Sequence, residues 1–527
     1  MASHAAPTRE RRRLTLAVLA VLTVVGLGGA YALESSGDPP AGDERTADTS
    51  AGDGDGDDEG DADDDASVDD EAVDDEAAGD EADDDGPVDD ARSSGFEREG
   101  LLTFRGSPTR TYYGEGPVPS APQILWSYPG ASGGMCAESS VGSDTHVWCG
   151  SGWTGQPSVF EEDGRTWVVF GAYDRNVHFV DWATGADILP PHPTDDIIKG
   201  SVTIDPDGFP LVYSGSRDNE YHVIAIDRSQ PVELWSLSAD AVSPTMWNND
   251  WDGSALVIDD YLFEGGENSQ FHIVKLNRSY GPDGLVQVDP QLVFNTPGWD
   301  QQLLNDIGDR GVSIENSVAI HEGVAYFTNG GGLVQGWDIS GLDQGITPTQ
   351  VFRFWTGDDT DATIVIDEEG FLYVASEYER GNARSQEVGQ LLKLDPRNPT
   401  NPVVWSVANR DFRPGGFWAT PALHDGVIIV PDDAGFVRGW DMATGAELWE
   451  FRLPGPTWQS PVVVDDVLIQ GDCDGVLHAY DVSDPRVLPP ELWQVTLGGC
   501  IESTPAVWNG RIFVGTRAGR FFAIGDP

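Results

Sequence analysis

A short module of β-strands recurs along the sequence, and this internal repeat constrains the fold more than any other feature. The full pattern has a polar residue before Ser/Thr-Pro, two short strands joined by an Asp-Gly-like turn, a third strand ending in Asp, and a fourth strand with Leu-Trp, and several copies match it more loosely. The copy "WATPALHDGVIIVPDDAGFVRGWDMATGAELW", from Trp418 to Trp449, shows the pattern most fully. Eight copies follow one another, and they begin at Gly155, Gly200, Asp252, Glu315, Asp361, Trp418, Trp458 and Glu502.

The repeat predicts an all-β fold, an eight-bladed β-propeller. Each complete copy holds four apolar or alternating segments that suit a buried four-stranded sheet, and such sheets repeating in series form propeller blades. The last copy stops before its fourth strand, and an isolated segment with Leu-Trp, "PQILWSYP", stands before the first copy. We expect this N-terminal strand, Pro122 to Pro129, to complete the eighth blade and close the ring.

A tryptophan in the fourth strand and a turn before it form the most visible motif of the repeat. We place a tryptophan in the same fourth-strand position of six blades, where its ring would pack on the neighbouring blade. In "WDMATGAELW", Asp441 and Thr444-Gly445 suit a tight turn, because Asp and Thr side chains bond the local backbone and Gly accepts positive φ. A catalytic aspartate would not recur from blade to blade, so the motif is structural. The six tryptophans are Trp126, Trp235, Trp355, Trp405, Trp449 and Trp493.

The N-terminus predicts a membrane anchor. Residues 1–13 are basic, and an uncharged apolar run of nineteen residues follows, from Leu14 to Ala32, which is long enough to cross a bilayer as a helix. Basic residues before it hold that end in the cytoplasm and the rest of the chain outside. The alternative is a cleaved signal peptide, because Ala30 and Ala32 fit a small-x-small cleavage site; the protein would then be secreted.

Residues 33–98 are expected to form a disordered acidic linker. Between Ala41 and Asp90 there are 25 acidic residues and one base, Arg45, and such a segment buries too little apolar surface to fold. The formal net charge of the whole chain is −59. Nucleic acid is therefore excluded as a partner, because binding phosphate requires positive surface.

The four cysteines predict two disulfides on one face of the ring. Strand direction alternates, so the loops that enter the first strands share a face with the turns between second and third strands. Cys136 and Cys149 bracket one inserted loop on this face, whereas Cys473 and Cys500 lie in neighbouring blades. An even count of cysteines outside the cytoplasm favours disulfides, and this topology pairs Cys136 with Cys149 and Cys473 with Cys500.

The same face is predicted to carry the binding site, at the mouth of the central channel. Polar residues just before the first strands would converge there, together with tryptophans and one turn of the third blade. Carboxylates at Asp252, Glu315 and Asp361 would suit calcium, and aromatic faces would suit a sugar or a quinone. The predicted mouth residues are Gln156, Lys199, Trp251, Asp252, Glu267, Asn268, Glu315, Asn316, Asp361, Trp418, Trp458, Gln459 and Glu502, with Trp153 close by.

The repeat resembles that of the pyrroloquinoline-quinone (PQQ) propeller family, in which a blade reads Ala-x-Asp-x-x-Thr-Gly-x-x-x-Trp. "GWDMATGAELW" and "VDWATGADIL" match it closely, and "LLTFRGSPTRTYYGEGPVP", Leu101 to Pro119, is similar to the segment before the family's first blade. The resemblance covers residues 99–527. It implies one of two functions: a quinoprotein dehydrogenase holding PQQ and calcium over the channel, or a cofactor-free scaffold such as the BamB-like propellers of the bacterial envelope.

Two departures from the dehydrogenases favour the scaffold. The chain has no adjacent cysteine pair and no Cys-x-x-Cys-His for an attached haem, and no residue is assigned a catalytic role. We expect a monomeric, non-catalytic propeller without cofactor, which binds an envelope protein or a small-molecule or carbohydrate ligand at its mouth. The alternatives are a PQQ- and calcium-dependent dehydrogenase and a polysaccharide-binding propeller.

Overall fold

A computed structural model describes residues 96, 98–130, 133–141, 144–153 and 155–527 of the chain. These residues all belong to one compact unit. The predicted basic N-terminus, the apolar segment at 14–32 and the acidic linker up to residue 95 lie outside the described residues. Within the described part of the chain, none of the helices combines the length and apolar character needed to span a membrane.

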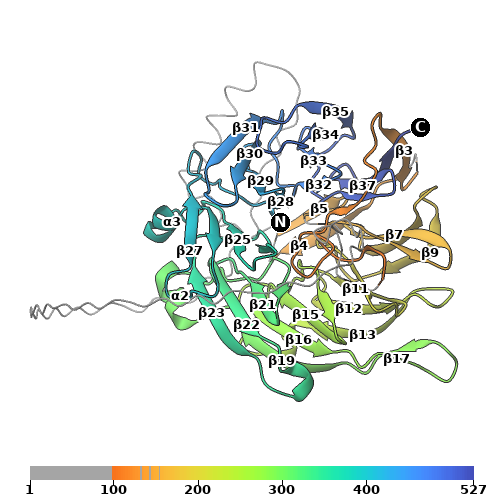
Figure 1. Ribbon diagram of the computed structural model, residues 1–527. Coiled ribbons are helices and arrows are strands. Elements are labelled where there is room, and N and C mark those ends of the chain that lie inside the picture. Colours follow the sequence, from red (N-terminus) through yellow and green to blue (C-terminus); the bar gives the residue numbers. More distant parts are fainter. Residues whose placement is uncertain (1–95, 97, 131–132, 142–143, 154) are drawn as a thin grey trace, which may run out of the picture. The chain divides into compact units, whose positions relative to one another are not determined.

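Eight sheets of four or five strands follow one another around a ring, as the repeat predicts (Figure 1). In seven of the sheets the four repeat strands pair antiparallel in chain order from the centre outwards. Blade 1 consists of β1 (Gly100–Leu101), β6 (Ser158–Glu162), β7 (Arg165–Ala172), β8 (Asn176–Asp181) and β9 (Asp187–Pro193), and blade 2 of β10 (Thr203–Ile204), β11 (Leu211–Gly215), β12 (Glu220–Ala225) and β13 (Val232–Ser238). Blade 3 consists of β14 (Leu256–Ile258), β15 (Tyr261–Gly266), β16 (Gln270–Lys275) and β19 (Gln291–Pro297), and blade 4 of β20 (Ala319–His321), β21 (Val324–Phe327), β22 (Leu333–Asp338) and β23 (Thr349–Trp355).

The other four blades have the same organisation. Blade 5 consists of β24 (Val365–Ile366), β25 (Leu372–Ala375), β26 (Leu391–Leu394) and β27 (Val403–Val407), and blade 6 of β28 (Ala422–His424), β29 (Val427–Pro431), β30 (Phe436–Asp441) and β31 (Glu447–Arg452). Blade 7 consists of β32 (Val462–Val464), β33 (Val467–Gly471), β34 (Val476–Asp481) and β35 (Glu491–Thr496), and blade 8 of β2 (Gly114–Glu115), β36 (Ala506–Trp508), β37 (Arg511–Thr516), β38 (Arg520–Gly525) and β3 (Gln123–Tyr128).

The eighth sheet combines both ends of the described chain. Strand β3 pairs antiparallel with β38, so a strand from the N-terminal side is the outermost strand of a blade built from the last residues (Figure 1). Strand β2 pairs parallel with the innermost strand, β36. The hairpins β4 (Cys136–Val141)–β5 (Asp144–Cys149) and β17 (Ser279–Tyr280)–β18 (Val286–Gln287), and the helices α2 (Gln301–Ile307) and α3 (Ala383–Val388), lie outside the blade sheets.

Neighbouring blades are joined through the predicted tryptophans. In blade 5, the indole Nε1 of Trp405 donates a hydrogen bond of 2.9 Å to the carbonyl of Met442, in the turn between the third and fourth strands of blade 6. The ring lies against Gly445 of the same turn, where a Cβ atom would come within 2.7 Å of it. The same contact joins Trp126 of blade 8 to the carbonyl of Trp182 in blade 1, at 3.0 Å. The Thr-Gly turn is thus the surface on which the tryptophan of the preceding blade packs.

The prediction of six equivalent tryptophans is wrong for Trp355. In the fourth strand, the tryptophan position pairs with the residue of the third strand that stands just before the β-bulge. Trp449, for example, pairs with Gly439. In blade 4 that position belongs to Phe352, which faces Gly336, and Trp355 lies three residues further along, at the end of β23. The short-range pattern could not reveal this shift, because the register depends on pairing with β22.

Substitution of Gly445 by alanine is expected to destabilise the protein by about 2–4 kcal/mol. The residue has φ +70°, which is unfavourable for a side chain, and the new methyl group would also displace the ring of Trp405. Gly510→Ala is a matched control, because Gly510 has φ +82° and open space around it. Chemical denaturation should show a smaller loss for Gly510→Ala; equal losses would contradict the role of the tryptophan contact.

The central channel is filled by the segment from Leu101 to Tyr113, which precedes the first blade. Its backbone accepts hydrogen bonds from three innermost strands: Leu102 from Ile204 at 2.7 Å, Pro108 from Ile320 at 2.8 Å and Thr109 from Ile366 at 3.1 Å. The buried side chain of Arg105 reaches another blade, because it donates hydrogen bonds to the carbonyls of Thr420 and Pro421, just before the first strand of blade 6. One segment that contacts so many innermost strands must lie at the axis of the ring.

A series of hydrogen bonds links the loops that enter the innermost strands of neighbouring blades. In blades 2, 4, 5, 6 and 7 a Ser or Thr hydroxyl accepts a hydrogen bond from the backbone N–H of the equivalent residue in the preceding blade, at 2.9–3.0 Å. We call these residues the hydroxyl ring. They are the Ser/Thr positions of the repeat motif, so that part of the motif also joins blade to blade. The hydroxyl ring consists of Ser201, Ser317, Thr363, Thr420 and Ser460.

Candidate functional site at the channel mouth

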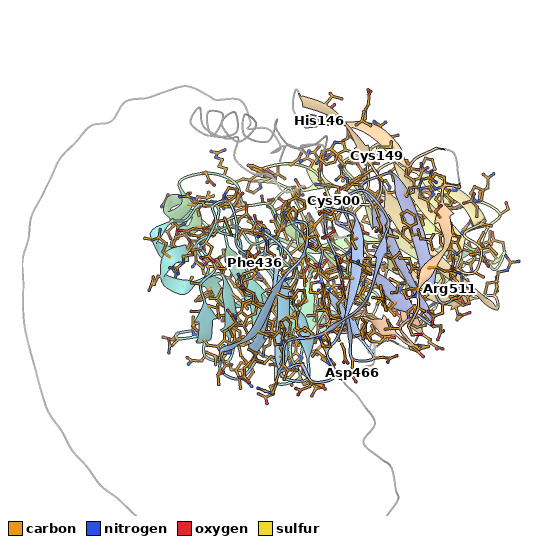
Figure 2. All side chains as sticks on the ribbon, turned by 90° about the horizontal axis from the view of Figure 1, so that it is seen from above. His146, Cys149, Phe436, Asp466, Cys500 and Arg511 are labelled. Atoms are coloured by element: carbon orange, nitrogen blue, oxygen red, sulfur yellow. A yellow bond between two sulfur atoms is a disulfide. The ribbon has the colours of Figure 1, made fainter. Side chains whose placement is uncertain are left out.

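The predicted face assignment and both predicted disulfides are confirmed. Cys136 is bonded to Cys149 and Cys473 to Cys500. Seen edge-on, His146, Cys149 and Cys500 lie on one side of the ring, whereas Asp466, in a turn between first and second strands, lies on the other (Figure 2). We call the side with the cysteines the mouth.

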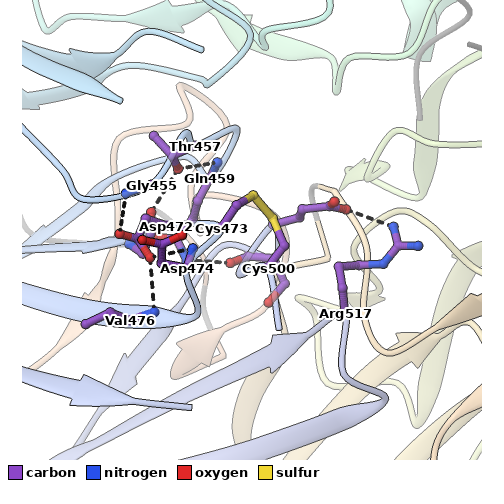
Figure 3. Close-up of a disulfide and its surroundings, with 12 residues drawn as sticks. Gly455, Thr457, Gln459, Asp472, Cys473, Asp474, Val476, Cys500 and Arg517 are labelled. Carbon is purple, nitrogen blue, oxygen red and sulfur yellow. Dashed lines mark hydrogen bonds and ion pairs between the residues drawn. A yellow bond between two sulfur atoms is a disulfide. The ribbon is translucent and has the colours of Figure 1, made fainter. Parts of the chain in front are cut away.

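The first disulfide closes the hairpin β4–β5, which covers part of the mouth. Trp148 of this hairpin lies between two arginines, with Arg217 of blade 2 at 5.5 Å and Arg517 of blade 8 at 5.1 Å from its ring centre. The second disulfide joins blades 7 and 8, and beside it Arg517 forms an ion pair of 3.0 Å with Glu502 (Figure 3). The mouth loops of blades 7, 8, 1 and 2 are therefore tied to one another.

Four of the predicted mouth residues hold the protein's own backbone. Gln156 accepts a hydrogen bond from the backbone N–H of Arg105 at 2.7 Å and donates to a carbonyl of blade 8 at 2.8 Å. Gln459 likewise donates to a blade 8 carbonyl at 2.9 Å. Asn268 and Asn316 also donate to backbone carbonyls. These amide side chains are buried, and they stabilise the channel wall and the loops.

Three predicted tryptophans meet at the mouth. The ring centres of Trp153 and Trp418 lie 5.9 Å apart, and those of Trp418 and Trp458 lie 5.8 Å apart. Trp153 is 3% exposed and Trp418 is 5% exposed. They come from the loops that enter blades 1, 6 and 7, so together they bridge a wide part of the mouth. Trp251 lies elsewhere, buried against Tyr221 between blades 2 and 3.

Lys199 is surrounded by carboxylates of blade 3. Its Nζ lies 3.2 Å from Asp250 Oδ2, 2.5 Å from Asp252 Oδ2 and 2.7 Å from Glu267 Oε1. Arg217 adds a contact of 2.5 Å to Asp250. The three acids, which we call the blade-3 group, are fully buried. An ammonium therefore occupies the place that a metal ion would take among these oxygens.

The pKa values of this cluster follow from its charges. Burial disfavours the ammonium, but Asp252 and Glu267 outweigh burial and hold the pKa of Lys199 well above its ordinary value. Burial also opposes ionisation of Asp250, yet Arg217 and Lys199 lower its pKa. Glu267 differs: burial raises its pKa to about 8, with help from Asp250 and Asp252 and against the effect of Lys199. The cluster has three acids and two bases, so its net charge is zero when Glu267 is protonated.

A second carboxylate group lies in blade 5. Oxygens of Asp359, Asp361 and Glu377 lie within 4.8 Å of one another, and all three side chains are buried. We call them the blade-5 group. Burial raises the pKa of Asp361 well above its ordinary value, and the charges of Glu315 and Asp359 add to this effect. Burial, then Asp361 and Asp359, do the same to Glu377.

The structure divides the predicted calcium ligands between these groups. Asp252 belongs to the blade-3 group and Asp361 to the blade-5 group, and Glu315 is a member of neither set of three. Asp359 and Glu377 were not predicted as mouth residues, and neither was Asp250. The sequence does carry a signal for them, because an Asp-x-Asp pair precedes the first strand in both blades 3 and 5.

Comparisons with known proteins agree with this fold. Residues 387–488 match the model of a family described as outer membrane protein assembly factor BamB. A quinohaemoprotein alcohol dehydrogenase from Comamonas testosteroni is 14% identical, with a TM-score of 0.53 over 81% of this chain and 80% of that one. A europium-containing methanol dehydrogenase is 12% identical, with a TM-score of 0.52 over 83% of this chain and 99% of that one.

BamB from Moraxella catarrhalis is 14% identical, with a TM-score of 0.38 over 78% of this chain and 99% of that chain. A search of curated proteins finds no match to the sequence. At these identities the two dehydrogenase structures, with TM-scores of 0.53 and 0.52, establish the fold alone. With the repeat, the eight sheets and the family match in agreement, the chain carries a PQQ-like β-propeller.

Proposed function

We propose that this chain is a non-catalytic propeller that binds a partner protein or a small ligand, a carbohydrate included, at its mouth. The observation that carries the proposal is the packing of Trp153 against Trp418, both buried. The mouth is also stapled by two disulfides and carries inserted loops, and loops on a rigid scaffold are the usual place for binding residues. A surface of this kind suits the binding of a partner protein or ligand on the mouth side of the ring.

The proposal includes the location of the protein. Disulfides are typical of proteins outside the cytoplasm, so the propeller would lie on that side. The apolar run from Leu14 to Ala32 would anchor it, and the acidic segment that follows would act as a spacer. If the run is cleaved as a signal peptide, the same propeller would be secreted.

A PQQ- and calcium-dependent dehydrogenase is the second candidate, and the buried carboxylates of the blade-5 group favour it. They suit calcium chemically, but the mouth tryptophans fit a quinone poorly. A planar ring inserted between Trp153 and Trp418 requires about 7 Å between their planes, whereas the ring centres lie 5.9 Å apart and the rings are tilted by 44°. The packing of these rings therefore favours the binding propeller.

A pair of photo-cross-linking variants tests the binding function. Phe412, in a mouth loop, and Tyr280, on the opposite side, are similarly exposed, at 53% and 56%, so a photoreactive phenylalanine analogue suits both positions. In the full chain on native membranes, we expect one specific cross-linked product from position 412 and none from position 280. Binding of PQQ with calcium, together with alcohol-dependent reduction of a dye, would instead establish the dehydrogenase.

A further inference from the structure

Blades 3 and 5 carry the same arrangement of acids. In each, an Asp-x-Asp pair stands before the first strand, at Asp250 and Asp252 or at Asp359 and Asp361. A glutamate follows after the second strand, Glu267 or Glu377, and its oxygen completes a set within 4.8 Å. The two groups are equivalent by the repeat, so blade 3 shows what the arrangement can hold.

The groups differ in the residue that the preceding blade contributes. Lys199 stands two residues before Ser201 of the hydroxyl ring, and its ammonium lies among the three oxygens of the blade-3 group. The equivalent residue for blade 5 stands two residues before Ser317, and it is Glu315. A cation in one blade is therefore replaced by an anion at the equivalent position of the other.

Nearby charges leave the blade-5 group strongly acidic. Arg380 approaches it from one side, with Nη1 at 3.8 Å from Asp359 Oδ2. Glu315, at the position equivalent to Lys199, brings a carboxylate where the blade-3 group has an ammonium. Asp361 is 1% exposed, and among the described residues nothing donates a hydrogen bond to its Oδ2. A buried carboxylate in this state is costly unless a cation or a proton neutralises it.

We propose that Asp359, Asp361 and Glu377 bind a divalent cation of the calcium class, in the position that the ammonium of Lys199 takes in the blade-3 group. Carboxylate oxygens are the ligands that hard divalent cations prefer. The cation site needs no quinone and no partner at the mouth. Its test is therefore independent of the test of the proposed binding function. It replaces the predicted set of Asp252, Glu315 and Asp361, of which Asp361 alone is retained.

Calcium titration of the full chain, freed of metal with a chelator, tests the site. Isothermal titration and thermal melting should both show binding by the unmodified protein. Asp361→Asn should weaken binding at least about tenfold, because the ion loses a charged ligand. Glu267→Gln is the matched control from the blade-3 group, and it should leave calcium binding unchanged.

A charge replacement gives the sharpest result. Glu315→Lys would place an ammonium beside the blade-5 group, as Lys199 is placed in blade 3. We expect this variant to melt at a higher temperature than the unmodified protein in chelator and to lose its response to calcium. Absence of calcium binding by the unmodified protein would overturn the proposal, and so would unchanged binding in both Asp361→Asn and Glu315→Lys. Cooperative melting of each variant shows that it has folded.

Discussion

Replacement of Arg110 by alanine is expected to lower the free energy of unfolding by about 3 kcal/mol. Its guanidinium donates to the carbonyls of Val318, Phe104 and Ser254 at 2.7–2.8 Å, and it is fully buried. Truncation would leave these oxygens without their donor and open a cavity in the channel. The arginine connects the channel segment to blades 3 and 4 at once.

Burial also affects the charge of this arginine, since it lowers the pKa of Arg110 to about 9. Part of the hydrogen-bond energy therefore offsets desolvation, which is why we do not expect a larger loss. Arg165→Ala, at an exposed position of β7, is the control and should change stability by less than about 0.5 kcal/mol. Denaturant unfolding of the full chain measures both. A loss below about 1 kcal/mol for Arg110→Ala would contradict a supporting role for the channel segment.

Substitution of Lys199 by methionine is expected to destabilise the protein by about 3–5 kcal/mol at neutral pH. The change keeps much of the volume but removes the ammonium from the three acids of the blade-3 group, which would then have Arg217 as their cation. Removal of one partner from a buried ionic cluster leaves uncompensated charge, and this cost exceeds the loss of the contact itself.

The loss should depend on pH. In the unmodified protein the pKa of Asp250 is lowered, so this carboxylate contributes stability above its unfolded pKa and loses it in acid. Without Lys199 the buried acids would have raised pKa values, and the folded variant would bind more protons than the unfolded chain. Its stability would then fall as the pH rises. The difference between the two proteins should therefore be largest near neutral pH and smallest near pH 4.

Lys275→Met is the matched control, because Lys275 lies over the ring of Tyr261 and has no place in the blade-3 group. Denaturation at several pH values separates the two explanations of a loss. An equal destabilisation of Lys199→Met at pH 4 and pH 7 would show that lost packing, and not charge, is responsible.

Local patterns predicted the elements of the fold well. The alternation of apolar residues and the turn motifs identify eight blades because each blade is built from neighbouring segments of chain. The pairing of cysteines follows from the same pattern, since alternating strands place their loops on one face. Trp355 shows where local pattern fails: its distance along the strand is close to that of the other tryptophans, but pairing with β22 gives the position to Phe352.

The candidate site was predicted less completely. Polar residues before the first strands were expected at the mouth, and Lys199, Asp252 and Asp361 do lie in its charged clusters. Which acids lie close to one another depends on side chains from two loops of one blade, and their net charge depends on the residue that the preceding blade contributes. A single sequence does not show that Lys199 lies among three carboxylates while Glu315 stands in the equivalent position.

The sequence by itself determined the number of blades, the face of the disulfides and the structural nature of the Asp-x-x-Thr-Gly turn, because these depend on periodicity and on contacts within or next to a repeat. The tertiary structure alone decided that the segment from Leu101 to Tyr113 fills the channel and that the mouth acids divide into two groups. Both depend on contacts between residues far apart in the chain, whose distances are set by closure of the ring.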